Sequence, residues 1–533
     1  MTKVTKHLIS AVTLLLCIGF VIFSCAKLYI KQDFRQIYRG FNDSIHKNLY
    51  KEAFFKVHLK NGDVSLLSDW SLNAERDSIL GNGKLFDFNR NELKEGPLVH
   101  NIDDIAIIET NQLEAIKSTD KDKISTLAVL TGVNLILDVA CIANPKACFG
   151  SCPTFYTANS NSVHDAKAES FSSAISPALE KMDMDALNTQ TGGGEFFLTM
   201  KNEAFETHML NELVLTAIPK KSHEFVFHDR RYKFYKSDYT ITPSSATVDG
   251  TDILCDISRM DDREFFSYTD KDDLTKKETI YLNFVGIQDQ QQGLVINFRQ
   301  SLLTTFLLYN GLSYMGDEVG DYFTKIETNT TVKNRLSNPF KLLGNIQLFV
   351  WDHNKDKWVF FDAIYETGPI SKNLIIAPIP KTLAHNQEVK IKIELTKGLW
   401  RLDYLGLSAI REVSDVTKIR PSEVMEIQGV SGGLQRVLSD DENYLVSFPG
   451  NEFVFRFELP ELRHQDAYEL FLSSKGYYLE WIRANWLMDK NTSKLEKMLS
   501  NDPGTWKLLA KEYKVVEHQM ERVFWNSKYG DIQ

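Results

Sequence analysis

The chain has 533 residues and a formal net charge of −10 at neutral pH, from 61 basic and 71 acidic side chains. This balance argues against nucleic-acid binding, which needs concentrated positive charge. A hydrophobic content of 43% and a charged content of 25% are ordinary for a globular protein, so neither extended disorder nor a multi-span membrane protein is indicated. The length is sufficient for about three domains.

The first 24 residues have the layout of a bacterial lipoprotein signal peptide. Two lysines form a basic start, residues 8–23 form an uncharged apolar segment, and Ser24 comes directly before Cys25. The segment resembles a lipobox, with Ile22 three positions before the cysteine. We therefore expect cleavage after residue 24 and a lipid such as palmitate on Cys25, which would attach the chain to a membrane. The alternative is an uncleaved anchor, because the apolar segment is nearly long enough to span a bilayer.

The next part of the chain is expected to form a tether over residues 25–51 and a small β domain over residues 52–115. Apolar and polar residues alternate across Asn61 and Gly62, which is the strongest short-range signal for a hairpin. A further short strand is expected at 105–108. The predicted domain is a small N-terminal β-barrel or meander.

An apolar helix is predicted over residues 120–145, ending at Pro145. Its central residues 124–143 are apolar enough to suggest a membrane span. Asn134 and Asp138 count against a span, because a carboxylate in hydrocarbon costs roughly 2.5 kcal/mol or more. We therefore expect a helix that is buried or lies on the membrane surface.

Residues 146–300 and 301–460 are predicted to form antiparallel β domains, the second a jelly-roll-like β-sandwich. The clearest strand covers 389–395, where apolar residues alternate with charged ones, so one face is buried and the other is wet. Residues 453–459 repeat this pattern, and 346–351 with 358–361 form a predicted hairpin. Further strands are expected at 197–200, 213–215, 280–285 and 294–298. A helix is expected at 301–315 and a loop at 186–194.

Residues 461–533 are predicted to be a helical C-terminal region, because the hydrophobic period changes after Pro460. The expected helices cover 464–489, 492–500 and 503–526, with Pro503 giving a start signal. The tryptophans of this region recur at helical spacing with leucines, which favours a core over an aromatic surface for a partner; they are Trp481, Trp486, Trp506 and Trp525.

Four cysteines remain once the signal peptide is removed and Cys25 is acylated: Cys141, Cys148, Cys152 and Cys255. An oxidising periplasm permits disulfides, and four cysteines allow three pairings. The favoured bridge joins Cys148 to Cys152, since Gly150 lets the short loop turn. The spacings do not match the paired cysteines of a zinc ribbon.

No residue pattern in the chain specifies a catalytic, metal or cofactor site. His223 and His228 imitate a metalloprotease motif, but their spacing of five and the strand-like residues between them place the two side chains on opposite faces. Glu203, Glu206 and His208 form the densest polar group beside a strand. A glycan or metal site there is the alternative to a polar strand end, which is favoured.

The run Asn144–Tyr156, NPKACFGSCPTFY, resembles a signature of a group of uncharacterised lipoproteins of the Bacteroidota. Residues 168–172 and 398–404 resemble the β domain of the same group. The resemblance implies an envelope location and a β-rich architecture. It implies no activity, so no catalytic residue is assigned from it.

The expected address is the periplasmic face of the outer membrane. Surface-exported lipoproteins of this kind carry acidic residues after the acylated cysteine, whereas Ala26 and Lys27 follow here, and Ala26 also lacks the aspartate of an inner-membrane retention signal. The predicted function is a structural or assembly partner of other envelope proteins. The alternatives are a carbohydrate-binding lipoprotein, because 389–407 resembles the closing strands of jelly-roll binders, and a hydrolase with a site assembled from distant residues, though an enzyme is the less expected outcome.

Overall fold

The structure is a computed structural model that describes most of the chain after residue 54. The predicted signal peptide, Cys25, the tether up to residue 51 and the apolar helix over 120–145 all lie outside the described residues, which are 55–59, 63–73, 78–86, 92–101, 104–110, 152–157, 166–202, 206–287, 290–365, 368–383, 387–426, 434–440, 443–447, 451–462, 466–480, 486 and 489–528. No described helix combines the length and the apolar character needed to cross a membrane.

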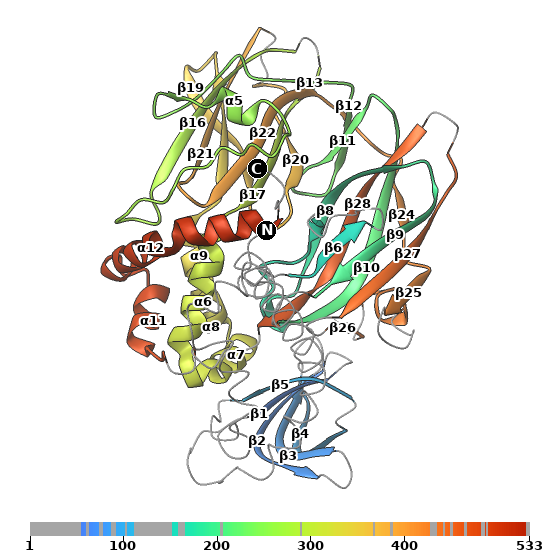
Figure 1. The fold of residues 1–533 in the computed structure, drawn as a ribbon, viewed down its shortest axis with the longest axis vertical. Helices are drawn as coiled ribbons and strands as arrows, with labels where there is room; N and C mark the ends of the chain where they lie inside the picture. Colours follow the sequence, from blue (N-terminus) through green and yellow to red (C-terminus); the bar gives the residue numbers. More distant parts are fainter. Residues whose placement is uncertain are drawn as a thin grey trace, which may run out of the picture.

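The N-terminal unit is a single open antiparallel sheet, drawn in blue in Figure 1. Its strand order is β4-β3-β2-β1-β5, so the first four strands form a meander and the fifth returns beside the first. In the first hairpin His58 pairs with Val64, as the Asn-Gly dipeptide predicts. The sheet does not close, which confirms the meander rather than the barrel; the strands are β1 Phe55–Leu59, β2 Val64–Asn73, β3 Ser78–Phe86, β4 Glu92–Asn101 and β5 Ile105–Thr110.

Two sheets built from distant parts of the sequence form the first sandwich. One sheet has the order β25-β27-β9-β6-β7, and the other has β24-β10-β28-β8 with β26 also paired to β10. The chain forms half of the sandwich, leaves, and returns about 200 residues later to complete it. Its strands are β6 Thr154–Thr157, β7 Ala166–Glu169, β8 Lys181–Thr191, β9 Gly194–Lys201, β10 Glu206–Lys221, β24 Thr417–Ile419, β25 Glu423–Glu426, β26 Leu445–Ser447, β27 Glu452–Leu459 and β28 Asp466–Glu480.

The second sandwich is formed by the part of the chain between these halves. One sheet has the order β13-β22-β17-β20-β11-β12-β23, and the other has β15-β14-β16-β21-β18-β19. All of its pairings are antiparallel except the contact of β11 with β20. The strands are β11 Phe225–His228, β12 Phe234–Ser237, β13 Thr240–Ile241, β14 Ser245–Val248, β15 Thr251–Asp252, β16 Lys277–Val285, β17 Gln292–Gln300, β18 Ile346–Asp352, β19 Lys357–Ile364, β20 Asn373–Pro378, β21 Glu388–Thr396, β22 Trp400–Ala409 and β23 Arg411–Glu412.

Alternating side chains explain how the second sandwich forms. On β21, Val389, Ile391, Ile393 and Leu395 are buried between the two sheets while the intervening charged residues are more exposed. The hairpin of β18 and β19 pairs Trp351 with Trp358, as predicted. This confirms the mainly β fold class with antiparallel sandwich sheets.

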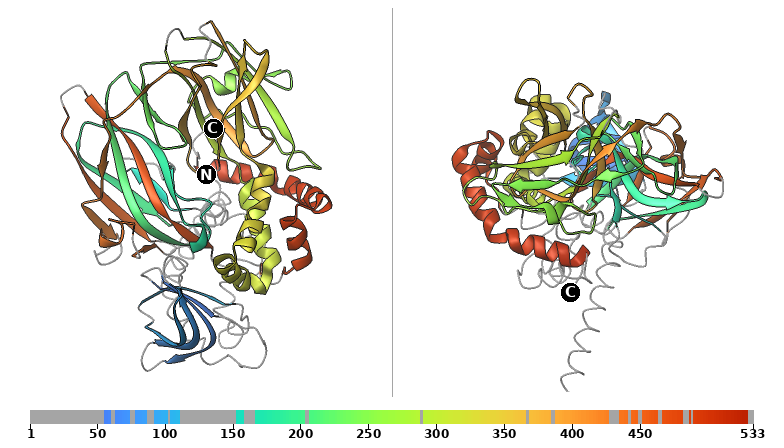
Figure 2. Two further views of the ribbon diagram at one scale, coloured as in Figure 1. Left: turned by 180° about the vertical axis from the view of Figure 1, so that it is seen from behind. Right: turned by 90° about the horizontal axis from the view of Figure 1, so that it is seen from above.

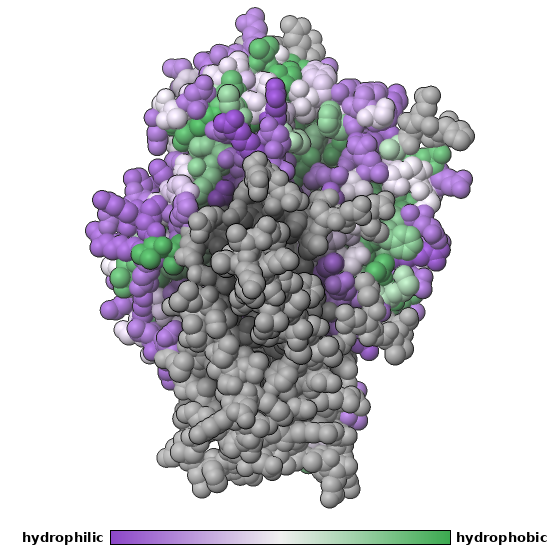
Figure 3. Space-filling view, in the orientation of Figure 1, coloured by the Kyte–Doolittle hydropathy of each residue, from purple (hydrophilic) through white to green (hydrophobic). Residues whose placement is uncertain are grey.

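Helices form a layer on one side of the molecule, across from the first sandwich, as Figures 1 and 2 both show. Four of them follow β17, and two close the chain after β28. The outer surface of this layer is mostly hydrophilic in the view of Figure 3. The helices are α6 Leu303–Met315, α7 Val319–Thr328, α8 Thr330–Leu336, α9 Asn338–Leu343, α11 Thr492–Leu499 and α12 Pro503–Lys528; a short α5, Leu254–Ile257, lies apart from them in the second sandwich.

The C-terminal helices agree with the sequence at two of three places. α11 and α12 match the predicted helices at 492–500 and 503–526, and each begins where a side chain accepts backbone N–H groups: Asn491 from Lys494 at 2.9 Å, and Asp502 from Thr505 at 2.8 Å. Trp486 and Trp506 are buried, which confirms their assignment to the core. The side chains of Trp481 and Trp525 lie outside the described set.

The predicted helix over 464–489 is wrong for residues 466–480, which form the long strand β28. This strand lies between β10 and β8 in the middle of its sheet. It is buried on both faces, so its apolar residues do not alternate, and the period of two that identifies a strand is lost.

The predicted loop over 186–194 is also wrong for most of its length. Residues 181–191 form β8, and only the turn to β9 remains between the strands. Gly193 has a φ of +105°, and a Cβ atom there would lie 2.5 Å from the carbonyl oxygen of Pro460. The three glycines therefore mark a tight, crowded turn rather than a long loop.

Candidate functional site

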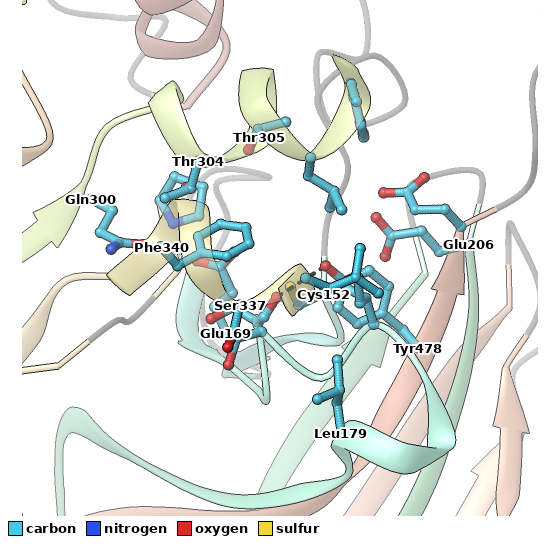
Figure 4. Close-up of a pocket in the computed structure, with 18 of the residues that line it drawn as sticks. Cys152, Glu169, Leu179, Glu206, Gln300, Thr304, Thr305, Ser337, Phe340 and Tyr478 are labelled. Carbon is cyan, nitrogen blue, oxygen red and sulfur yellow. Dashed lines mark hydrogen bonds between the residues drawn. The ribbon is translucent and has the colours of Figure 1, made fainter. Parts of the chain in front are cut away.

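A cavity of about 260 Å³ lies where the first sandwich, the helical layer and the second sandwich meet. We call it the junction cavity. Its size is slightly below that of pockets that hold drug-sized molecules. The lining residues come from β7, from η3 (Pro177–Leu179) and the segment before it, from the paired ends of β10 and β28, from the last residue of β17 and from helices α6 to α9. Cys152, before β6, and Pro369, before β20, complete the lining, which Figure 4 shows in part.

The helical wall of the junction cavity is mainly apolar. Leu308 and Tyr309 belong to α6, Ile326 to α7, Leu336 to α8 and Phe340 to α9. Leu308, Tyr309, Leu336 and Phe340 are only half-buried, so their apolar surface is available to the cavity. Ile175 and Leu179 from the segment at η3 complete the apolar lining.

The sheet wall of the junction cavity carries three buried carboxyl groups. Glu206 is the first residue of β10 and Glu480 the last of β28, and the two lie directly opposite each other in the strand register. Glu169 ends β7, and its Oε2 accepts the backbone N–H groups of Ile370 at 2.5 Å and Ser371 at 3.1 Å. The topology therefore brings together three acids from residues 169, 206 and 480.

Cys152 lies among these acids, with Glu169 and Glu206 on opposite sides of it in Figure 4. Burial raises the pKa of the Cys152 thiol well above its ordinary value, and the negative charges of Glu169, Glu206 and Glu480 raise it further. A thiol with a raised pKa is protonated at neutral pH and is a poor nucleophile. This chemistry favours a binding site over a cysteine-dependent active site.

Tyr478 is the aromatic residue of the sheet wall. Its hydroxyl donates to the carbonyl oxygen of Ser172 at 2.9 Å. Burial raises the pKa of Tyr478 well above its ordinary value, with the charges of nearby groups, Glu206 and Glu480 among them, adding to the effect. Tyr478 is therefore neutral and acts as a fixed wall of the junction cavity.

The polar group that the sequence suggested as a possible site, Glu203, Glu206 and His208, lies partly at the junction cavity. Glu206 lines the junction cavity, and Nε2 of the buried His208 lies 3.1 Å from its Oε2. Glu203 lies outside the described residues. The polar group beside the strand is thus in part a buried feature of the junction cavity, a position that the local sequence could not reveal.

The histidine pair and the predicted disulfide do not form sites. Residues 225–228 form β11, as the strand-like pattern predicted, with the His223 side chain 62% exposed and His228 buried. Cys152 is a free cysteine and Cys148 lies outside the described residues, so the structure gives the predicted bridge no support. The two cysteines are close in sequence, but burial beside three acids decides the environment of Cys152.

Four residues of the lining were not predicted from the sequence: Glu169, Gln300, Tyr478 and Glu480. Glu169 lies within the resemblance segment 168–172, which was the one available signal. Glu480 lies in the segment 464–489 that was predicted to be a helix. Its position opposite Glu206 depends on a strand pairing between residues more than 250 positions apart, which local sequence does not show.

A second feature lies on the outer surface of the β16-β21-β18-β19 sheet. We call it the aromatic face, and its rings lie around Lys392. The ring centroids of the cross-strand pair Trp351 and Trp358 are 5.2 Å apart, and those of the pair Phe349 and Phe360 are 5.7 Å apart. The Lys392 ammonium lies 4.0 Å from the Phe349 ring centre. Tyr281 is 46% exposed and Phe360 is 51% exposed, so this surface is open to solvent.

Comparison with known proteins gives no family. No protein-family model matches the chain, and no curated protein sequence matches it. Solved structures that match include the T13 IBDV viral particle, at 9% identity and a TM-score of 0.16 over 91% of this chain and 88% of that chain, and the Gt strain of infectious bursal disease virus, at 9% identity and a TM-score of 0.16 over 88% and 87%. Likeness at this level carries no inference about fold or function.

Proposed function

We propose that this chain is a lipid-anchored, periplasm-facing outer-membrane protein that binds a small molecule in the junction cavity. The address rests on the lipobox-like segment before Cys25 and on the absence of acidic residues at positions 26 and 27. The binding function rests on the junction cavity, and the two parts of the proposal are tested separately.

The observation that carries the binding function is the division of the junction cavity into an apolar wall and an acidic wall. Ligand pockets are mostly apolar with a few convergent polar groups that orient the ligand. Here α6 to α9 supply the apolar wall, and the strand ends supply Glu169, Glu206 and Glu480. Since the thiol of Cys152 and the hydroxyl of Tyr478 are held neutral, the chemistry of the site is suited to recognition.

The binding function predicts that filling the junction cavity abolishes ligand binding. Thr305 on α6 lines the cavity, and a Thr305→Trp substitution places an indole in its space. The detergent-solubilised full chain is screened against a small-molecule panel by thermal shift and native mass spectrometry. We expect compounds that raise the melting temperature of the wild type by several degrees to leave the variant unchanged.

The matched control is Thr331→Trp, because Thr331 is exposed on the neighbouring helix α8 and does not line the junction cavity. This variant is expected to respond to the panel as the wild type does. Equal ligand shifts in the Thr305→Trp variant and the wild type would contradict binding in the junction cavity.

The aromatic face favours a second candidate function, the docking of another envelope protein. Exposed aromatic residues are enriched at protein interfaces. The double substitution Tyr281→Ser with Phe360→Ser removes its two most exposed rings, and Tyr239→Ser removes a ring of similar exposure elsewhere. A pull-down from detergent-solubilised envelopes should lose its co-purifying protein only with the double variant. Recovery of the monomer alone from the wild type would end this candidate, and specific hits on a glycan array would replace it with the carbohydrate-binding alternative.

A further inference from the structure

We propose that strand β19 binds a second copy of this chain, so that two β19 strands pair in antiparallel fashion about a two-fold axis at Val359. The inference goes beyond ligand binding in the junction cavity and does not depend on it. It follows from the open edge of β19, the side chains of the strand and the charges at its two ends.

β19 is the last strand of its sheet. It pairs with β18 on one side and with no described strand on the other. In an antiparallel ladder, every second residue directs its backbone N–H and C=O groups away from the neighbouring strand. The free side of β19 therefore presents a row of backbone groups to which another strand can bind.

Most other sheet edges in the described part of the chain are protected against such pairing. β7, β13, β15, β23, β24 and β25 have only two to four residues each. β4 is longer but contains Pro97, which has no N–H group, and Gly96 at a φ of +120°. β8 is long but packs against β7 and β20. β19 has eight residues and neither proline nor glycine.

The outer side chains of this edge are aromatic. Trp358 and Phe360 lie opposite Trp351 and Phe349 of β18, so both rings are on the same face of the sheet. Phe360 is exposed. A long edge strand with exposed apolar side chains is the kind of strand that pairs with another chain.

The open part of β19 covers residues 357–361. The turn that contains Asp356 joins its start to β18. At its end a β-bulge leaves Phe361 without an opposite residue on β18, and Arg230, from the turn between β11 and β12, lies 2.7 Å from the carboxylate of Asp362. The pairing surface is therefore short, and charged groups lie at both of its ends.

The charges at the two ends are complementary in a two-fold pair. Asp356 and Arg231 are both exposed, and neither forms an ion pair with a described residue. Antiparallel pairing of two copies places the start of one β19 beside the end of the other. The Asp356 carboxylate of each copy then approaches Arg230 and Arg231 of the other, and the symmetry forms this contact twice.

The register at Val359 combines this charge contact with aromatic pairs. With the axis at Val359, Trp358 of each copy lies opposite Phe360 of the other, and cross-strand aromatic pairs stabilise antiparallel sheets. An axis at Phe360 places Trp358 opposite Asp362 instead. An axis at Trp358 places Asp356 opposite Phe360. The Val359 register is therefore the one that the side chains favour.

Sedimentation velocity of the detergent-solubilised full chain, with most micelles empty, measures the association. We expect the wild type to dimerise as its concentration rises. Phe360→Lys should weaken the dimer by at least about tenfold, because it places an ammonium group beside the rings of the other copy at each end of the ladder.

Gln347→Lys is the matched control for Phe360→Lys. Gln347 is exposed and lies on the same face as Phe349, but its strand β18 is paired on both sides, with β19 and with β21. This variant should dimerise as the wild type does. Circular dichroism establishes that each variant is folded.

A charge exchange tests the ends of the pair without altering the strand. Asp356→Arg and Arg231→Asp should each weaken the dimer by about tenfold, because each places like charges together at both ends. The two substitutions in one chain restore opposite charges across the axis. The double variant should therefore regain a dissociation constant within about threefold of the wild-type value.

A disulfide tests the register. Residues directly opposite each other in antiparallel strands have Cα atoms about 4.5–5.5 Å apart, which is within the range for a disulfide. In a Cys255→Ser background, which removes an exposed free thiol, oxidised Val359→Cys should give a covalent dimer on a non-reducing gel. Gln347→Cys in the same background should stay monomeric.

The outcomes separate the second copy from the proposed functions. A wild type that stays monomeric, or a dimer that survives Phe360→Lys and is not captured through Val359→Cys, overturns pairing at β19. If the wild type is monomeric but the pull-down recovers another envelope protein that the double variant of the aromatic face loses, docking at that face stands without the second copy. Thermal shifts of Phe360→Lys with the small-molecule panel report on the junction cavity alone, because β19 contributes no residue to its lining.

Discussion

An Arg299→Ala substitution should lower the free energy of unfolding by roughly 3–5 kcal/mol, the range measured when one partner of a buried ion pair is removed. Arg299 and Glu264 are buried at 0% and 2% side-chain exposure, and two hydrogen bonds join them, Nε to Oε1 at 2.7 Å and Nη2 to Oε2 at 2.8 Å. Truncation leaves the Glu264 carboxylate in the interior without this bidentate partner. The urea midpoint, followed by circular dichroism, measures the loss.

The matched control for Arg299→Ala is Arg263→Ala. Arg263 pairs with Asp256 at a similar distance of 2.8 Å, but its side chain is 66% exposed. Exposed pairs contribute about 0–1 kcal/mol, so the control should change the urea midpoint little. Equal losses in the two variants would show that the Arg299–Glu264 pair does not stabilise the second sandwich.

The cost of Arg299→Ala should also depend on pH. Burial by itself raises the pKa of Glu264, but the attraction and hydrogen bonds of Arg299, with Arg401 and Lys372, hold the pKa below its ordinary value. In the wild type this stabilisation is present above the unfolded pKa near 4.3 and is lost as the pH falls through the lower, folded pKa. In the variant the carboxyl can be protonated at acidic pH, so the difference between the two proteins should shrink there.

The second large effect is expected from Cys25→Ala, which should abolish incorporation of a palmitate label and leave the chain at its full, uncleaved length. Cys25 is the predicted site of lipid attachment, and each buried CH₂ of an acyl chain contributes about 0.8 kcal/mol to membrane binding. Removing the thiol removes both the lipid and the cleavage signal. Fractionation of envelopes, with labelling by a radioactive or clickable palmitate, measures anchoring and lipidation in the same cells.

Cys17→Ser is the matched control for the lipid anchor. Cys17 lies inside the apolar segment that is expected to leave with the signal peptide, so its loss should alter neither labelling nor membrane attachment. Label retained in the Cys25→Ala variant would contradict lipidation at this residue. A wild-type protein that is full-length and carries no label would instead favour the uncleaved anchor.

Strands with one buried face could be predicted from local sequence. Residues 389–395 and 453–459 alternate between apolar and polar, and both form strands whose apolar residues are buried. Successive side chains of a strand point to opposite faces, so a strand with one buried face has an apolar residue at every second position. The helix expected at 301–315 also matches α6, but α7, α8 and α9 were not predicted.

Elements buried on both faces could not be predicted in the same way. β28 lies between β10 and β8 and is buried on both faces, and its run of apolar residues was assigned to a helix. Its neighbours, β10 and β8, lie more than 240 residues earlier in the chain. Local pattern reasoning has no access to such partners.

The sequence by itself determined the mainly β architecture, the two C-terminal helices and, as a prediction, the lipid address at Cys25. These features depend on local periodicity, capping residues and a short N-terminal pattern. The junction cavity was decided only by the tertiary structure. Glu206 and Glu480 become neighbours through the pairing of β10 with β28, and Glu169 and Gln300 join them through packing between the sandwiches, so the ligand site depends on contacts between residues that are far apart in the sequence.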